Sequence, residues 1–230
     1  MVKTLRMNIL GIDFSKNSPG VVRLNLDDKT LEVIDTDYLG FSTVKKVCDA
    51  DTQIQHYHIK NSFHNDIQKA QFMRDTICDW ITYDPDYCAF EGYAMKADGR
   101  VFDIAETTMC TKLMIYDWEI PIRIYDPNSI KIYATEKGNS DKIRIVDEFE
   151  KFSGIKPDLS NLPEYKSPKE DIVDAFWVAK LLQTELQLRR GLIQLKNLTL
   201  KQIEVFNRVT KGNPINILGT PFIKKVNDEE

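Results

Sequence analysis

Asn8-Ile9-Leu10-Gly11-Ile12-Asp13-Phe14 is the stretch of sequence that decides the fold. Its composition is that of a buried strand, and one carboxylate, Asp13, interrupts the apolar run near its end. Two further segments rich in Ile, Leu and Val follow at 21–26 and 31–39, and the turn signals Asn-Ser-Pro-Gly and Asp-Asp-Lys separate the three segments. The pattern predicts three consecutive antiparallel strands.

A helix and a fourth strand are predicted next along the chain. A polar, irregular stretch from 41 to about 65 comes first. Apolar residues then recur at helical spacing from Ile67 to Ile81, which predicts a helix. The segment 87–90 is apolar and is predicted to be a buried strand that ends at Glu91.

The rest of the core alternates helix, strand and helix. Residues 101–118 have a helical pattern, and 122–125 are predicted to be a short buried strand. Ser140 is a good N-cap for a helix that runs to about 152. The stretch Ser167-Pro168-Lys169-Glu170 has the form of a capping box, and we expect it to begin a last core helix from 168 to about 188.

Length and composition favour one main domain. The chain has 230 residues, of which 42% are hydrophobic, and this is enough to bury one sizeable core. The order of elements predicts an α/β fold with a five-stranded mixed sheet, in which three antiparallel strands are followed by parallel strands and flanked by helices. We expect a domain boundary near Gly191, between a core at 1–188 and a basic C-terminal extension at 189–230.

The sequence predicts a soluble protein of the cytoplasm with no membrane partner. No run of about 18 apolar residues occurs, and the N-terminal residues lack the pattern of a secretory signal. The four cysteines lie far apart at 48, 78, 88 and 110 with no C-x-x-C spacing. That spacing fits neither a disulfide framework nor a zinc knuckle, so we expect reduced thiols.

Charge is unevenly distributed along the chain. The formal net charge is -4, but the stretch from Lys180 to Lys225 holds nine lysines and arginines against two acids, Glu185 and Glu204. This stretch has a net charge of +7, and the rest of the chain is strongly acidic. A basic surface of this kind suits nucleic acid, although a solvated amphipathic tail would show the same pattern.

Four carboxylates are the candidate chemical groups. Asp13 and Glu91 each end an apolar strand, where a buried carboxylate without a cation or donors would be costly. Asp171 and Asp174 are three residues apart, so a helix presents both on one face near its N-terminus. If the first and fourth strands are neighbours and the last helix crosses them, the four carboxylates converge.

Such a convergence predicts a site for divalent cations. Hard oxygen ligands without a nearby set of His or Cys favour Mg²⁺ or Mn²⁺, and two such ions can stabilise the attacking and leaving oxygens of phosphodiester hydrolysis. Taken singly, each acid also fits a structural role, as a turn-side acid, a strand-end surface residue or an early-helix partner of the helix dipole.

Three stretches resemble, in order and spacing, the motifs of the RuvC-type Holliday junction resolvases of the RNase H-like superfamily. They are Gly11-Ile12-Asp13-Phe14-Ser15, Phe90-Glu91-Gly92-Tyr93-Ala94-Met95-Lys96 and Asp171-Ile172-Val173-Asp174-Ala175. The resemblance covers roughly 7–185 and has the divergence of a bacteriophage-encoded branch, of the lactococcal phage type. It implies an RNase H-like fold whose catalytic and metal-binding acids are Asp13, Glu91, Asp171 and Asp174.

The resemblance also implies partners and further catalytic residues. The family has two lysines near the scissile phosphates, and Lys131 and Lys142 match them and their eleven-residue separation. Members act as homodimers that nick opposite strands of a four-way junction, with two Mg²⁺ ions, replaceable by Mn²⁺, expected in each active site. We expect the dimer to form through the apolar face of the helix at 101–118.

The residues expected to contact DNA come from these motifs, from the surroundings of the two lysines and from the basic stretch. They are Ser15, Tyr93, Lys96, Lys131, Lys137, Lys142, Arg144, Arg189 and Arg190. Arg144 also fits the role of a solvated helix residue.

The sequence departs from the cellular enzymes in three places. Tyr93 is two residues after the second acid, whereas those enzymes have a base-stacking aromatic residue one position further along the chain. The insertion at 41–65 is long, and the extension after about Leu188 has no counterpart in them.

The insertion also holds a weaker candidate for a metal site. His56, His58 and His64 have Asp49, Asp51 and Asp66 nearby, but the pattern of supporting residues that a metal site needs is missing.

The predicted function is structure-selective cleavage of branched DNA, most of all four-way junctions, in phage recombination, replication or packaging. A DNA-binding protein without activity and a nuclease for RNA–DNA hybrids are the alternatives within this fold. An ATPase of the actin and sugar-kinase superfamily shares the motif around Asp13, but it would need a second phosphate loop and a duplicated domain, for which 230 residues are short.

Overall fold

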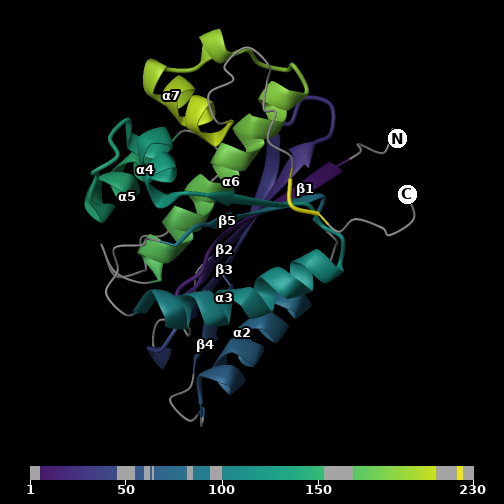
Figure 1. Cartoon of the computed structure of the whole chain (residues 1–230), viewed down its shortest axis with the longest axis vertical. Coiled ribbons are helices and arrows are strands. Elements are labelled where there is room, and N and C mark those ends of the chain that lie inside the picture. The colour runs from purple at the N-terminus through teal and green to yellow at the C-terminus, as the bar shows by residue number, and fades with distance from the viewer. Residues whose placement is uncertain are drawn as a thin grey trace.

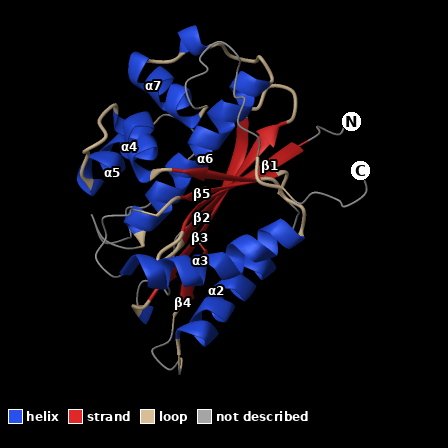
Figure 2. Ribbon diagram, viewed as in Figure 1, coloured by secondary structure: helices blue, strands red, loops and turns tan. Residues whose placement is uncertain are grey.

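The protein is a three-layer α/β structure, in which helices cover both faces of one central sheet (Figure 1, Figure 2). The computed structural model describes residues 6–45, 55–59, 63, 65–81, 85–93, 100–152, 168–210 and 222–224. Among the helices of these segments, none combines the length and the apolar composition that crossing a membrane requires.

Six strands form the sheet, in the order β4-β3-β2-β1-β5-β6. They are β1 (Arg6–Asp13), β2 (Gly20–Asp27), β3 (Val33–Ser42), β4 (Gln55–His58), β5 (Tyr87–Glu91) and β6 (Ile122–Tyr125). The first three strands are antiparallel, as the turn signals between them predict. β5 runs parallel to β1, and β6 runs parallel to β5, so the carboxyl ends of β1, β5 and β6 meet at one edge.

The helices divide between the two faces of the sheet. α2 (Asp66–Trp80) and α3 (Arg100–Asp117) lie on one face, next to each other. The helices of the other half of the molecule are α4 (Pro127–Thr135), α5 (Lys142–Lys151), α6 (Lys169–Arg189) and α7 (Leu200–Val209). α6 is the central helix of that face and crosses β1, β2 and β5.

Strand alternation sorts the core into two clusters. Ile9 of β1 and Ala89 of β5 face the side of α6, whereas Leu10 of β1 and Phe90 of β5 face the side of α2 and α3. Because successive side chains of a strand point to opposite faces, every second residue after Ile9 and Ala89 belongs to the α6 side. Asp13 and Glu91 both stand at such positions.

Two glycines let α6 approach the sheet closely. A Cβ at Gly11 of β1 would collide with the backbone of Ala175, and a Cβ at Gly20 of β2 would collide with the backbone oxygen of Asp171. The absence of side chains at these two strand positions therefore brings the first turns of α6 down onto the ends of β1 and β2.

The sheet has six strands where the sequence predicted five. The additional strand, β4, lies within the stretch 41–65 that was expected to be irregular, and it pairs in parallel with β3 from Leu39↔Gln55 to Ser42↔His58. Its four residues are polar or aromatic and lack apolar alternation, since β4 is an edge strand that is half-exposed.

The caps of α5 and α6 also differ from the prediction. Asp141, not Ser140, caps α5 and accepts a hydrogen bond from the N–H of Arg144, because the hydroxyl of Ser140 is bonded to Thr135 (2.6 Å). α6 begins at Lys169 with Pro168 as its N-cap and has no side-chain cap bond, while Ser167 lies outside the described residues. Glu170, the other half of the expected capping box, pairs with Lys142 instead.

Part of the region expected to be a C-terminal extension packs with the core. Val205 and Phe206 of α7 are buried in the same cluster as the inner face of α6. Further on, Ile223 forms an antiparallel bridge with Ile122 at the outer edge of β6. The described residues after Gly191 therefore contribute to the hydrophobic core as well as to the basic surface.

Candidate active site

Asp13 and Glu91 come together because of strand register. β1 and β5 are neighbours with Ile12 paired to Phe90, so the next residue of each strand, Asp13 and Glu91, ends its strand at the same level. Both side chains belong to the face that α6 covers. The predicted convergence of the acids requires the first strand and the strand that ends at Glu91 to be neighbours. In the structure these two strands are neighbours.

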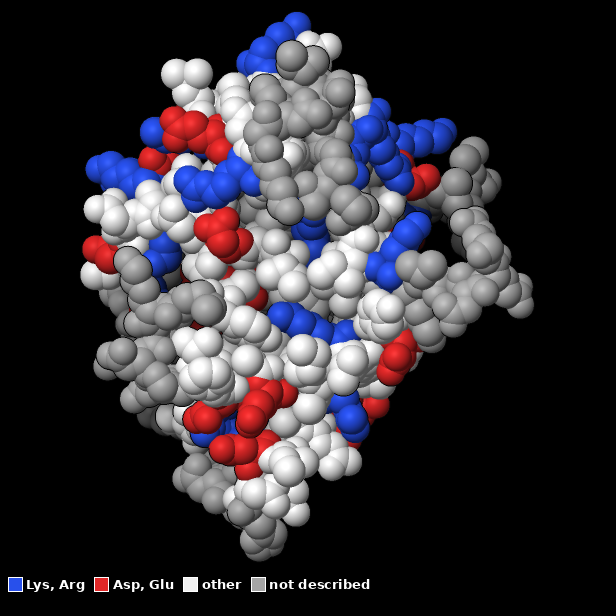
Figure 3. Space-filling view, in the orientation of Figure 1, with Lys and Arg blue, Asp and Glu red and all other residues white. Residues whose placement is uncertain are grey.

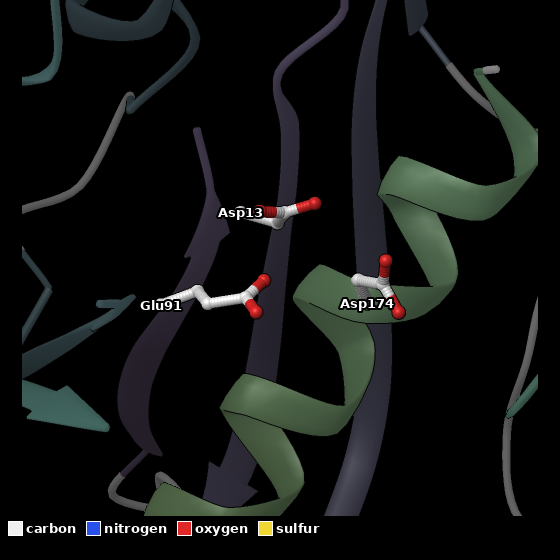
Figure 4. A group of neighbouring side chains, drawn as sticks. All are labelled: Asp13, Glu91 and Asp174. Atoms are coloured by element: carbon white, nitrogen blue, oxygen red, sulfur yellow. The ribbon is translucent and has the colours of Figure 1, made fainter. Parts of the chain in front are cut away.

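Asp174 reaches the same point from α6. One carboxylate oxygen from each of Asp13, Glu91 and Asp174 lies within 4.8 Å of the others, and we call these three residues the carboxylate cluster (Figure 4). Asp171, one turn earlier on α6, is buried and lines the same pocket. The close approach of α6 to Gly11 and Gly20 accounts for the convergence of a helix residue with two strand ends.

A pocket of about 370 Å³ opens over the carboxylate cluster. The acids form its floor, and its walls come from three helices and from the segments that follow β1 and β5. The wall residues include Ser15, Tyr93, Ile104, Lys131 and Lys142. The pocket therefore offers a substrate both anionic groups at its base and ammonium groups at its side.

Burial and mutual repulsion disfavour the negative charges of the carboxylate cluster. Burial, together with the charges of Glu91 and Asp174, raises the pKa of Asp13 well above its ordinary value. Burial also raises the pKa of Glu91, although the hydrogen bond with Asp13 and the charge of Lys142 oppose the rise. The pKa of Asp174 is raised to about 7 by burial and by Glu91. Carboxylates in this arrangement gain from a cation that neutralises them.

Two lysines flank the cluster. Lys142, the first residue of α5, lies with its Nζ 3.4 Å from Asp174 Oδ2 and 3.3 Å from Glu170 Oε2. Burial works against the ammonium charge, but Asp174, Asp171 and Asp13 outweigh it and raise the pKa of Lys142. Lys131 of α4 lines the pocket and lies near enough for its charge to lower the pKa of Glu91. The structure thus brings both predicted lysines to the predicted acids.

The donor set fits a hard divalent cation. Three carboxylates converge with raised pKa values, so each has charge that the protein alone leaves poorly compensated. Mg²⁺ and Mn²⁺ prefer carboxylate oxygen, and no histidine or cysteine joins this group within the described residues. Asp13, Glu91 and Asp174 would hold such an ion, with Asp171 beside them.

The other residues expected to contact DNA are placed differently from one another. Ser15 lines the pocket, and its hydroxyl accepts a hydrogen bond from the N–H of Ser18 (2.9 Å). Tyr93 also lines the pocket. Lys137 is exposed at the turn between α4 and α5, whereas Arg144 donates to the carbonyl of Thr135 (3.2 Å) and ties that turn together. Lys96 lies outside the described residues.

Arg189 and Arg190, at the end of α6, have partners within the protein. Arg189 binds the fully buried carboxylate of Glu185, which also pairs with Arg123 (3.0 Å). The guanidinium of Arg189 lies 4.8 Å from the ring centre of Phe222. Arg190 pairs with Asp28 in the turn between β2 and β3 (3.2 Å). These contacts give both arginines a packing role at a distance from the pocket.

The histidine-rich insertion does not form a metal cluster among the described residues. His58 lies with its ring nitrogen 3.2 Å from the carbonyl of Thr43, and Asp66 pairs with Lys16. The side chain of His56 and the residues Asp49, Asp51 and His64 lie outside the described part.

Two residues that contact pocket-lining side chains were missed by sequence reasoning. Glu170 was interpreted only as part of a capping box, although its four-residue spacing from Asp174 on a helix would have placed both acids on one face. Lys112 of α3 is buried, and its ammonium lies 4.5 Å from the ring centre of Tyr93 and donates to the Tyr93 hydroxyl (3.1 Å). No sequence signal identifies it, because the contact joins two elements that are distant in the chain.

Comparisons with known proteins identify the fold. No family model matches the chain, and no curated protein matches it in sequence. Among solved structures, Thermus thermophilus RuvC is similar with a TM-score of 0.52 and 12% identity, over 80% of this chain and 97% of that one. Thermus thermophilus RuvC in complex with a Holliday junction substrate is similar with a TM-score of 0.54 and 13% identity, over 81% and 97%.

A fowlpox virus Holliday junction resolvase also matches, with a TM-score of 0.40 and 14% identity, over 78% of this chain and 99% of that one. The fold assignment rests on the two Thermus thermophilus structures. At this level of identity they establish that the chain has the RuvC-like fold that the sequence motifs predicted.

Proposed function

We propose that the protein is a divalent-metal-dependent endonuclease that nicks branched DNA, most of all four-way junctions. The observation that carries the proposal is the carboxylate cluster, which stands at the carboxyl ends of two central strands of a RuvC-like fold, in a pocket with two lysines. The solved relative with a Holliday junction bound supports branched DNA as the substrate.

Asp13, Glu91 and Asp174 are proposed to hold the cations, with Asp171 as a weaker fourth ligand. The activation of water and the stabilisation of charge on the phosphate would come from Mg²⁺, or from Mn²⁺ in its place, with two ions expected in each site. The residues themselves fix the geometry, because two of them stand on paired strands and the others on a helix pressed against those strands. Rigid elements of this kind hold ligands in a set arrangement.

Lys131 and Lys142 are proposed to act on the scissile phosphate. Both lysines line the pocket that contains the acids, where their ammonium groups can offset negative charge that develops on the phosphate during hydrolysis. Ser15 and Tyr93 are proposed to contact the nucleotides beside the cut, because both line the same pocket. Lys137, exposed at the α4–α5 turn, extends the basic surface next to them.

The proposal also includes the oligomeric state of the protein and its biological role. A homodimer would nick the two symmetric strands of a junction in one encounter, and a row of exposed apolar residues on α3, namely Phe102, Met109 and Leu113, is its proposed interface. The sequence resemblance to a phage-encoded branch supports a role in phage recombination, replication or packaging in the host cytoplasm.

A panel of labelled substrates tests the proposal. Four-way, three-way, flap and linear DNA and an RNA–DNA hybrid are incubated with the protein in Mg²⁺, Mn²⁺ or Ca²⁺, next to the Asp13→Asn variant. We expect paired nicks in the four-way junction with Mg²⁺ or Mn²⁺ and none with the variant. Cleavage of the hybrid alone would make the protein a ribonuclease, and junction binding without any cleavage would make it a binding protein.

A further inference from the structure

The ammonium of Lys142 lies between an acid of the carboxylate cluster and an acid outside it. Asp174, at 3.4 Å, belongs to the cluster, whereas Glu170, at 3.3 Å, does not. The two acids are four residues apart on α6, so they stand one above the other on one face, and Lys142 reaches across to them from the start of α5. The lysine is thus shared between the cluster and a neighbour.

Glu170 is well placed to control where that ammonium stands. Its side chain is only 16% exposed, so its carboxylate has little freedom to turn toward solvent, while the Lys142 side chain is 49% exposed and longer. Glu170 and Asp174 both lie within ion-pair distance of the Lys142 ammonium, and the charges of Asp171 and Asp13 act on it as well. Without Glu170, the acids left to hold the ammonium would be those of the pocket, namely Asp174, Asp171 and Asp13.

An ammonium held only by these pocket acids would oppose cation binding. It would neutralise one of the three proposed ligands, and its positive charge would repel a divalent cation at short range. A second acid that draws the ammonium to the rim of the cluster relieves this conflict. It also keeps the lysine over the pocket, where the proposed function requires it.

We propose that Glu170 is a positioning residue, which holds the Lys142 ammonium beside the carboxylate cluster so that Asp174 remains available to a divalent cation. The inference deepens the proposed function and rests on it for the cation that the cluster takes. Glu170 itself touches neither the cation nor the substrate in this scheme, since it acts through Lys142.

The test is a double-mutant cycle on Mn²⁺ binding, measured by calorimetry on the full chain without DNA. The variants are Glu170→Gln, Lys142→Gln and the combination of both. We expect Glu170→Gln to weaken Mn²⁺ binding by roughly tenfold and Lys142→Gln to strengthen it. In the Lys142→Gln background, the loss of Glu170 should have a clearly smaller effect, because the ammonium that it positions is gone.

The matched control is Glu150→Gln. Glu150 is paired with Lys169, the residue next to Glu170 on α6, so the substitution removes the same charge and a similar ion pair (3.1 Å) away from the cluster. It should leave Mn²⁺ affinity within about twofold of the wild type. Circular dichroism of each variant establishes that it is folded.

Each outcome decides the proposal. Equal effects of Glu170→Gln in both backgrounds would show a plain through-space charge effect and would overturn the positioning role, as would an unchanged affinity in Lys142→Gln. Should Glu170→Gln fail to fold, an unchanged Mn²⁺ affinity in Lys142→Gln would still overturn the proposal. Because no DNA is present, a chain that follows the expected cycle but cuts no substrate would refute the proposed nuclease and leave the role of Glu170 intact.

Discussion

At the scale of single residues, the carboxylate cluster makes opposite demands on binding and on cleavage. In the absence of metal, its acids repel a phosphate that enters the pocket, since like charges about 4 Å apart repel by about 1 kcal/mol even in a water-like dielectric. With metal, the same oxygens would hold the cation on which the proposed hydrolysis depends. Neutralising one acid should therefore help the first process and stop the second.

We predict that Asp13→Asn, Glu91→Gln and Asp174→Asn each lower the single-turnover cleavage rate by several orders of magnitude while preserving or strengthening junction binding in EDTA. Asp171→Asn should retain more activity, because Asp171 stands outside the closest group of oxygens. Gel-shift titrations in EDTA and cleavage in Mg²⁺ measure the two effects. Near wild-type cleavage by the Asp13 and Glu91 variants would rule out the proposed metal site.

The raised pKa of Asp174 predicts how the stability of the metal-free protein depends on pH. Its pKa is about 7 in the folded protein and near 3.8 in an ordinary setting, so between these values the folded state binds more protons than the unfolded chain. Stability must then fall as the pH rises from about 4 to about 7. Asp13, whose pKa is also raised, acts in the same direction.

We therefore expect the melting temperature in EDTA to fall between pH 5 and pH 8, and Mn²⁺ to restore it at pH 8. The fall should be smaller in Asp174→Asn, which cannot ionise at this position. Thermal unfolding at several pH values measures both effects. A melting temperature that rises with pH in the wild type and in the variant alike would contradict the assignment.

At the scale of elements, α7 supports the helix that carries Lys131. The guanidinium of Arg208 of α7 lies 3.8 Å from the carboxylate of Asp126, the N-cap of α4. When the Asn128 amide is oriented so that both its oxygen and its nitrogen form hydrogen bonds, the oxygen accepts from Arg208 (2.9 Å). Asn128 in turn donates to the carbonyl of Gly138 (2.8 Å). A residue of the basic stretch is thus used to fix the first turn of α4.

We predict that Arg208→Ala slows single-turnover cleavage by roughly tenfold while junction affinity changes by less than about threefold, because it loosens α4 and with it Lys131. Lys131→Ala is the reference variant for this comparison, since it should slow cleavage more than it weakens junction binding. In the double variant, the loss of Arg208 should add little to the loss of Lys131. A drop in affinity without a drop in rate would instead make Arg208 a DNA contact.

Much at this scale could be predicted from the sequence, and the exceptions have physical causes. The apolar runs around Asp13 and Glu91 identified the central strands, and the spacing of Asp171 and Asp174 identified one face of α6. β4 escaped detection because an edge strand needs no apolar alternation. The adjacency of β1 and β5 and the contact of Arg208 with Asp126 depend on tertiary pairing, which local patterns do not encode.

At the scale of the whole molecule, basic and acidic side chains are concentrated in different halves. On the face shown in Figure 3, most of the basic side chains gather over the half that carries α6 and α7, and acidic side chains form a group over the half that carries α2 and α3. Lys196 and Lys201 are exposed in the basic half. The overall negative charge therefore leaves room for a surface that attracts DNA.

We predict that Lys196→Ala with Lys201→Ala weakens junction binding and makes its salt dependence shallower, by about 0.9 in the logarithmic slope for each phosphate that the protein no longer neutralises. The control is Arg74→Ala, on α2 at the opposite face of the sheet, which should leave the slope unchanged. Binding titrations across a range of salt concentrations measure the slope. An unchanged slope in the double variant would assign these lysines to solvation alone.

The exposed apolar row on α3 leads to a prediction about assembly. We expect the wild type to sediment as a dimer at micromolar concentration and Met109→Glu with Leu113→Glu to sediment as a monomer, since charges in an apolar interface are costly to bury. Leu200→Glu, at a still more exposed apolar position on α7, should leave the dimer intact. A wild-type mass equal to one chain, with or without junction DNA, contradicts the proposed homodimer.

The bridge between Ile122 and Ile223 has a consequence for how the protein is made. On the ribosome, β6 emerges well before residue 223, and until then its outer edge is an open template for pairing with other chains. Val205 and Phe206 are likewise missing from the core until α7 has emerged. Contacts between such distant segments also form slowly. The nascent chain therefore passes through a stage in which the outer edge of β6 is unpaired, and a chaperone that shields this edge would act at that stage.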